Sequence, residues 1–345
     1  MGAATVNPDH TSLPVRAAKR LLNPALLAGI AGYSLIIWLA YLMLSRLTPD
    51  ALSFDLFGRH LTVDHLHDRL MDKALFILVI PPIFFLLEFL VVGWEDSSAG
   101  HLLTRLTPSG RSDIAMYFVG FLPGMHFIIS VLTFGVAFIT ATWLRTQIQN
   151  TTGLSLTIVG APLAVQMGIL FLLYTFGDYW AHRIDHLKAL WPLHRYHHAA
   201  EDFYSITASR VHPISFTSII SLTLPAALVE SSLDALAYTA FFIACLRVVI
   251  HSRIESDFGW LGRWVIQAPL HHRLHHRLDL VGPAKHLGLT PIWDRMFGTW
   301  DGQVNGKIVV GVDTPYRHGA WIGPDLVRDY RDFLMDTTDV VLTTL

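Results

Sequence analysis

Charged residues are scarce in this chain. They make up 15% of its 345 residues, against roughly a quarter of a typical soluble domain. Hydrophobic residues make up 52%, and the mean hydropathy is positive, at +0.44. This composition excludes an ordinary soluble domain and predicts an integral membrane protein. The formal net charge of −2 offers no basic surface, so we expect no nucleic-acid partner.

Cysteine and several catalytic motifs are also missing. Cys245 is the single cysteine, so no disulfide can form within the chain, and we expect it to pack as a small hydrophobic residue. No His-Glu-x-x-His or Glu-x-x-His occurs, which argues against a zincin protease and a ferritin-like di-iron bundle. No Gly-x-Ser-x-Gly, nucleotide-binding glycine loop or His-Pro-Gly-Gly haem motif provides another route to chemistry.

Histidine, by contrast, is abundant and clustered. Five of the 19 histidines lie between His182 and His198, and four lie between His271 and His276. On a helix, residues three or four positions apart share a face. That spacing relates eight of them in three sets: His182 and His186; His194, His197 and His198; and His272, His275 and His276. Neutral imidazole is the commonest protein metal ligand, so three such faces predict a polyhistidine metal site.

Eight histidines exceed the needs of one tetrahedral ion, whereas two metals with four or five imidazoles each would use them all. Ligand type alone leaves zinc, copper, iron and nickel open. His251 is a further candidate ligand on the same helical face as Arg247, although it also fits an interfacial histidine beside a snorkelling arginine. His212 is the least certain candidate. Among nearby carboxylates, Asp178 is the best candidate to hold a ligand ring from behind.

Four apolar stretches are long enough to cross a bilayer. They are residues 24–45, 74–94, 114–143 and 160–181, and a further apolar pair, 214–230 and 234–254, forms either a re-entrant hairpin or two spans. Both readings of the pair return the chain to the same side. The basic residues that flank these segments favour a cytoplasmic N-terminus, so an even number of crossings predicts that the histidine boxes and the C-terminus face the cytoplasm too.

Four motifs follow one another within residues 175–300. They are Asp178-Tyr-Trp-Ala-His182-Arg-Ile-Asp-His186, Trp191-Pro-Leu-His194-Arg-Tyr-His197-His198, Pro269-Leu-His-His272-Arg-Leu-His275-His276 and Ile292-Trp-Asp-Arg-Met-Phe-Gly-Thr299. Together and in this order, they resemble the fatty acid hydroxylase/sterol desaturase superfamily. The resemblance implies an all-α integral membrane protein with about four transmembrane helices, the further apolar hairpin, and a cytosolic helical cap that carries the histidine boxes. It also implies two iron ions, with His251 at the position of an additional family ligand.

The implied reaction is an O2-dependent oxidation of a membrane lipid, with hydroxylation of a C–H bond favoured over desaturation. Electrons would come from an external donor of the ferredoxin, cytochrome b5 or reductase type. The different-class alternative is a non-enzymatic membrane protein, either a metal transporter or a haem-binding protein. Transporters bind near the bilayer midplane, whereas these boxes lie just beyond the predicted spans. The predicted division is an N-terminal region (1–160), a catalytic domain (161–300) and a C-terminal tail (301–345).

One position departs from the family pattern. Where the family usually has Asn, followed by an aromatic residue and Gly, this chain reads Lys285-His286-Leu287-Gly288. We expect His286 to replace an amide behind the ligands or to reshape the substrate entry.

Overall fold

The computed structural model describes residues 20–56, 59–63, 67, 83–119, 136–215, 217, 228–278, 284–302 and 308–344. Backbone proximity divides the chain into two compact units, residues 1–99 and 100–345. The described residues are mostly helical, as predicted. All the candidate ligand histidines lie in the second unit.

The first unit contains the membrane-spanning candidate α2 (Pro24–Leu47). Its segment Leu26–Leu47 is long and apolar enough to cross a bilayer, and it is the single helix within the described ranges that meets this test. An antiparallel hairpin of β1 (Leu52–Leu56) and β2 (Arg59–Val63) follows. Of the predicted span 74–94, residues 74–82 lie outside the described residues.

The other predicted spans fall in the second unit. Only the two ends of 114–143 are described, in α5 (Pro108–Val119) and α7 (Val136–Thr152), and most of 214–230 lies outside the described residues. The predicted segments 160–181 and 234–254 correspond to α8 (Leu163–Asp185) and α11 (Leu233–Ile250). The all-helical expectation thus holds for these segments, and the number of spans stays a prediction.

Helices α8 and α11 start side by side. Glu230 pairs with Thr157 in a short parallel bridge, and the Ser232 backbone N–H donates to Gln166 Oε1 at 2.8 Å. Further along, Tyr174, Ile243, Ile250 and Leu289 form a buried apolar cluster between the helices. Both helices then end in candidate ligands, with His186 the C-cap of α8 and His251 the C-cap of α11.

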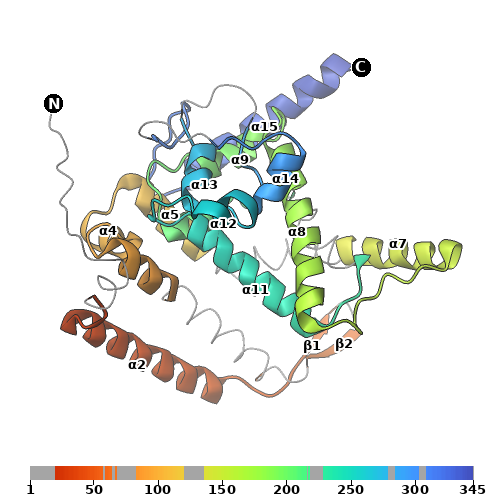
Figure 1. Cartoon of the computed structure of the whole chain (residues 1–345), viewed down its shortest axis with the longest axis horizontal. Coiled ribbons are helices and arrows are strands. Elements are labelled where there is room, and N and C mark those ends of the chain that lie inside the picture. The colour runs from red at the N-terminus through yellow and green to blue at the C-terminus, as the bar shows by residue number, and fades with distance from the viewer. Residues whose placement is uncertain are drawn as a thin grey trace. The chain divides into compact units, whose positions relative to one another are not determined.

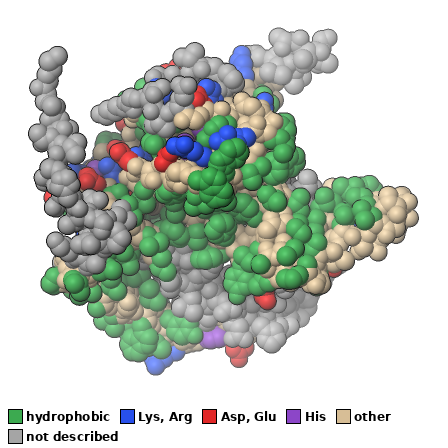
Figure 2. Space-filling view, viewed as in Figure 1, with side chains coloured by type: hydrophobic (Ala, Val, Ile, Leu, Met, Phe, Trp, Pro, Cys, Tyr) green, Lys and Arg blue, Asp and Glu red, His purple; other side chains and the backbone are tan. Residues whose placement is uncertain are grey.

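Short helices collect at this histidine end (Figure 1). Those labelled there are α9 (Trp191–His198), α12 (Gly259–Trp264), α13 (Pro269–His275) and α14 (Pro291–Met296). The 3₁₀ turn η2 (Ser205–Ser209) contacts α5 and α11, and α4 (Ser98–Thr104) precedes α5 along the chain. Helices α9, α13 and α14 each carry proline in the first turn, which needs no N–H donor there. In α9 and α13 these residues are Pro192 and Pro269, and each precedes a set of candidate ligands. On the visible face, charged side chains lie mainly over this end, above a largely hydrophobic surface (Figure 2).

Residues predicted as a C-terminal tail form α15 (Gly323–Thr344), which packs on α9. Met116, Tyr196 and Ile322 make a second buried cluster there, joined by Leu326. Helix α9, which carries three of the candidate ligands, is therefore supported from behind by the last helix of the chain.

Candidate metal centre

The structure gathers nine of the ten candidate histidines into two groups, each with its ring nitrogens within 4.8 Å of one another. The five-histidine group consists of His182, His186, His194, His198 and His275, and the four-histidine group of His197, His251, His272 and His276. The groups adjoin, because the ring of His198 stacks on that of His276 with centroids 4.1 Å apart.

Backbone carbonyls orient two members of the five-histidine group. His182 Nδ1 lies 2.7 Å from the Leu287 carbonyl oxygen, and His275 Nδ1 lies 2.7 Å from that of Lys285. A carbonyl only accepts hydrogen bonds, so each Nδ1 carries the proton and each Nε2 keeps a lone pair. The buried His182 Nε2 has no hydrogen-bond partner, and His275 Nε2 lies 3.3 Å from His186 Nε2.

The four-histidine group is oriented in the same way. His197 Nδ1 donates to the Arg210 carbonyl at 3.2 Å, and His251 Nδ1 donates to the Arg247 carbonyl at 2.7 Å. The Nε2 atom of His251 lies 3.3 Å from that of His197 and 2.9 Å from that of His272. Neither ring nitrogen of the buried His276 has a hydrogen-bond partner.

These contacts fit a metal. His197 and His251 point Nε2 lone pairs at each other across 3.3 Å, an arrangement that is repulsive unless a cation lies between them. Two nitrogens each about 2.1 Å from one ion lie roughly 3 Å apart. The observed separations of 2.9–3.3 Å therefore suit shared metal binding in both groups.

Burial keeps the imidazoles neutral. It lowers their pKa well below the ordinary value, and neighbouring histidines lower it further, at His186, His194, His197, His198, His272, His275 and His276. A neutral imidazole has a lone pair to give to a metal. The electrostatics of both groups therefore favour metal binding at neutral pH.

Two candidates lie elsewhere than expected. His212 belongs to neither group; its Nε2 lies 3.1 Å from the Leu326 carbonyl, and its Nδ1 accepts from the Ile214 N–H at 3.3 Å. Asp178 pairs with Arg247 of α11 and makes no hydrogen bond to His182, whose Nδ1 is held by a backbone carbonyl. In this arrangement His212 lies outside both groups, and Asp178 forms an ion pair with another helix rather than a hydrogen bond to a ligand ring.

Two cavities reach the histidines. The first, of about 120 Å³, touches His182 and His194 of one group and His197, His251 and His272 of the other. Its apolar wall consists of Ala181, Leu193, Ala208, Val211, Ile250, Leu287 and Leu289. The second, of about 470 Å³, touches His186, His198 and His275 and is bordered by polar residues that include Lys188, Arg277 and Asp313.

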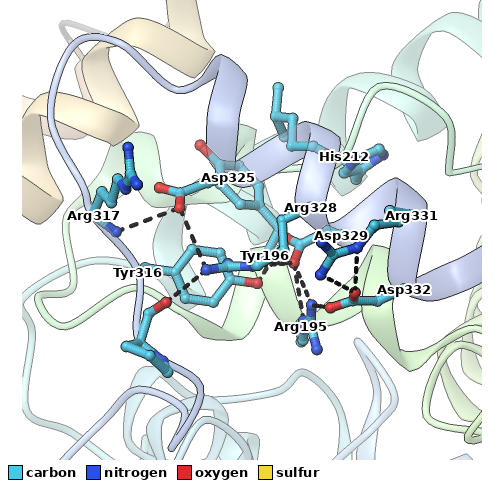
Figure 3. Close-up of polar contacts among 12 residues, drawn as sticks. Arg195, Tyr196, His212, Tyr316, Arg317, Asp325, Arg328, Asp329, Arg331 and Asp332 are labelled. Carbon is cyan, nitrogen blue, oxygen red and sulfur yellow. Dashed lines mark hydrogen bonds and ion pairs between the residues drawn. The ribbon is translucent and has the colours of Figure 1, made fainter.

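Buried ion pairs brace the ligand helices. Arg195, next to His194, contacts Asp329 at 2.7 Å and Asp332 at 2.5 Å, both on α15 (Figure 3). Arg210, whose carbonyl orients His197, is fully buried and pairs with the buried Asp113 at 2.9 Å. Because bidentate and charge-assisted contacts fix geometry well, these pairs limit how far α9 can shift.

Sequence reasoning missed the carbonyls of Lys285, Leu287 and Arg210, since a backbone group leaves no mark in a side-chain motif. It recognised the motif that contains Asp294 but assigned no contact to it. In the structure Asp294 is buried and accepts hydrogen bonds from Leu287, Gly288 and Thr299.

Known proteins resemble this chain over the residues that form the site. Residues 167–299 match the family model described as fatty acid hydroxylase. Alkylglycerol monooxygenase from Homo sapiens is 32% identical over 148 residues, or 42% of this chain and 32% of the relative. The Danio rerio enzyme is 34% identical over the same shares. Ornithine lipid hydroxylase from Rhizobium tropici is 27% identical over 162 residues, or 44% of this chain and 49% of the relative.

These matches place residues 167–299 in the fatty acid hydroxylase superfamily and confirm the resemblance predicted from the histidine motifs. The chain spans about a third to a half of the length of these relatives. No solved structure matches the chain significantly.

Proposed function

We propose that the chain is an O2-dependent di-iron monooxygenase that hydroxylates a C–H bond of a membrane lipid. The observation that carries this proposal is the pair of neighbouring histidine groups, together with the Nε2 lone pairs of His197 and His251 that face each other in one of them. The proposed ligands are the nine grouped histidines. The named activities of the relatives, alkylglycerol monooxygenase and ornithine lipid hydroxylase, favour hydroxylation of an amphiphilic lipid.

When bound, a pair of iron ions supplies the oxidising power that an unactivated C–H bond requires, using O2 and electrons from a donor. The protein positions the lipid relative to the histidine groups. The first cavity brings an apolar wall, including Leu193, Ile250 and Leu289, up to members of both groups. A lipid chain that lies against this wall meets the histidine face from the α8–α11 side, while the Nδ1–carbonyl bonds keep each Nε2 directed inward.

The polar borders of the two cavities suit different tasks. Thr217 donates to Asp185 at 2.9 Å in the first cavity, and Arg247 pairs with Asp178 there, so charged groups at this wall are satisfied within the protein. An apolar chain can then approach without breaking the Arg247–Asp178 ion pair or removing the hydrogen bond to Asp185. The second cavity reaches only the five-histidine group among the described residues and offers a polar approach from another side.

The test uses membranes that contain the full chain, an ether glycerolipid and an acyl ornithine lipid as substrates, and a reconstituted reductase. Under ¹⁸O2 we expect a product with one labelled oxygen atom, and no product from the His275→Ala variant. Product that forms at the full rate without O2 contradicts the proposal. A new double bond without label moves the assignment to the desaturase alternative.

Metal stoichiometry is tested by elemental analysis of chain purified from iron-supplemented cells, because zinc competes for imidazole ligands. We expect two metal ions per chain. At most one per chain contradicts the dinuclear proposal.

For the membrane arrangement we propose a multi-pass protein with its histidine groups on the cytoplasmic side. The apolar helix α2 supports membrane attachment. A reporter fused after Leu345 should be active in the cytoplasm. Activity of that reporter only on the outer side contradicts the proposed orientation.

A further inference from the structure

We propose that the loop of residues 285–288, held in place by Asp294, positions two ligands of the five-histidine group and thereby controls how tightly that group alone retains its metal. The inference rests on the proposed function, since it requires metal in that group. The inference is based on two backbone carbonyls that are two residues apart in the sequence. Lys285 directs its carbonyl to His275 Nδ1, and Leu287 directs its carbonyl to His182 Nδ1, both at 2.7 Å.

Asp294 holds this loop through its backbone. The Leu287 N–H donates to Oδ1 at 2.8 Å and the Gly288 N–H donates to Oδ2 at 3.0 Å. Thr299 also donates to Oδ1, at 2.7 Å. The carboxyl group is 1% exposed, so water cannot replace these contacts. Removal of the carboxylate would leave two buried N–H groups without an acceptor, a change that costs more than the loss of an exposed hydrogen bond.

His286, between the two carbonyls, has a left-handed backbone with φ of 56°. Its N–H donates to the Thr299 carbonyl at 3.0 Å, and its carbonyl accepts from Gln267 Nε2 at 2.6 Å. Left-handed backbone is tolerated by Gly, and by Asn, Asp and His better than by other residues, and it is a marked outlier for β-branched residues. The role of His286 in this arrangement is to let the chain reverse so that both neighbouring carbonyls face ligands.

Gly288 completes the loop by allowing close approach. A Cβ atom at this position would lie 2.8 Å from the Thr290 carbonyl oxygen and 3.1 Å from Asp294 Oδ2. Any side chain would therefore push the loop away from the carboxylate that holds it. The motif that contains Asp294 and Thr299 thus contacts no ligand directly. It acts on the metal site by holding the loop whose carbonyls orient two ligands.

The four-histidine group does not use this loop. Its two oriented members donate to the carbonyls of Arg210 and Arg247. A weakened loop should therefore release one metal and spare the other, an asymmetry that general unfolding would not produce.

The experiment loads the purified full chain with cobalt(II), whose absorption reports ligand geometry, and follows metal release to a chromophoric chelator. We expect Asp294→Ala to accelerate release of one equivalent about 10- to 100-fold, the effect usual for partners of metal ligands, and to leave the other rate unchanged. In Asp294→Ala, the absorption bands of one cobalt equivalent should differ from those of the parent before any metal is released. Asp294→Asn, which keeps one acceptor oxygen, should fall between the parent and Asp294→Ala.

A second pair of variants separates positioning from loss of folding. His286→Gly keeps the left-handed backbone accessible and should release both equivalents within about threefold of the parent rates. His286→Val should accelerate the same single equivalent as Asp294→Ala, because a β-branched residue disfavours this backbone. Equal behaviour of the Gly and Val variants overturns the proposed role of the backbone.

A parent chain that binds no metal overturns the proposed function and this inference with it. A parent that binds two metals, with an Asp294→Ala variant that releases both at the parent rates or both equally faster, overturns the inference alone.

Discussion

The two histidine groups share ligand chemistry but differ in access. The five-histidine group has three half-buried members, His182, His186 and His194, and is reached by both cavities. Three of the four histidines in the other group are buried, and the first cavity touches His197, His251 and His272 of that group, whereas the second touches none of its members. Phe203 also stacks on His251 and meets His276 edge-on. We call the five-histidine group, which has a polar approach, the open group, and the four-histidine group, which meets the apolar first cavity and Phe203, the enclosed group.

This difference suggests that the two metals have different roles. Solvent access and the apolar surroundings of a metal site govern its exchange and its potential. We expect the enclosed group to hold its metal as a fixed part of the fold, and the open group to be the one whose surroundings change during turnover.

The largest effect should come from His275 and His276, the last residue of α13 and its C-cap. His275 belongs to the open group and His276 to the enclosed one. We expect His275→Ala and His276→Ala each to reduce activity more than about 100-fold, because a ligand contributes more than its supporting partners. Elemental analysis should find one metal lost in each variant, from different groups. If either variant keeps two metals, the division of ligands described here is wrong.

The next largest effect concerns the free energy of unfolding and the buried ion pairs that support each group. Arg210→Met removes the partner of the fully buried Asp113, and we expect a loss of about 3–5 kcal/mol in the free energy of unfolding. Arg195→Met, which frees the less enclosed Asp332 together with Asp329, should cost about 1–3 kcal/mol. Denaturant unfolding in detergent measures both. Equal losses would argue that the enclosed side is no more dependent on its ion pair than the open side.

A third measurement compares the groups in the unaltered protein. Release of metal to a chelator should be biphasic, with one equivalent at least about tenfold faster because of its polar access. His275→Ala should remove the fast phase and His276→Ala the slow one. The opposite assignment would reverse the comparison.

The smallest effect should come from His212. Its ring nitrogens contact backbone atoms of Leu326 and Ile214, and it lies outside both groups. We therefore expect His212→Asn to keep two metals per chain. Loss of either metal from this variant would show that His212 is a ligand after all.

The parts of the site that depend on local spacing could be predicted from the sequence. Intervals of three and four residues placed the box histidines on shared faces, and Pro192 and Pro269 marked the helix starts. His251 could be proposed because it ends an apolar segment one helical turn after Arg247. The predicted family resemblance followed from the same short motifs and is confirmed by the match over residues 167–299.

Features that depend on distant segments could not be predicted. The allotment of adjacent histidines to different groups requires the positions of α8 and α11, which no local pattern gives. Asp178 stands one turn before His182, yet its partner is Arg247 from another helix. The departure at His286 was interpreted from its side chain, and the structure adds a left-handed backbone and a buried ring that stacks on His271, neither of which the sequence shows.

Adjacent residues on α9 and α13 separate the two metals that we propose. His197 and His198 belong to different groups, and so do His275 and His276. Successive residues of a helix diverge by about 100° at a fixed rise, so the interval between the two ions would be a property of the backbone. Insertion of a single residue in either helix would exchange ligands between the groups. Changes that adapt such a protein to another lipid must therefore fall on the cavity walls, where the chain can vary without altering the spacing of its metals.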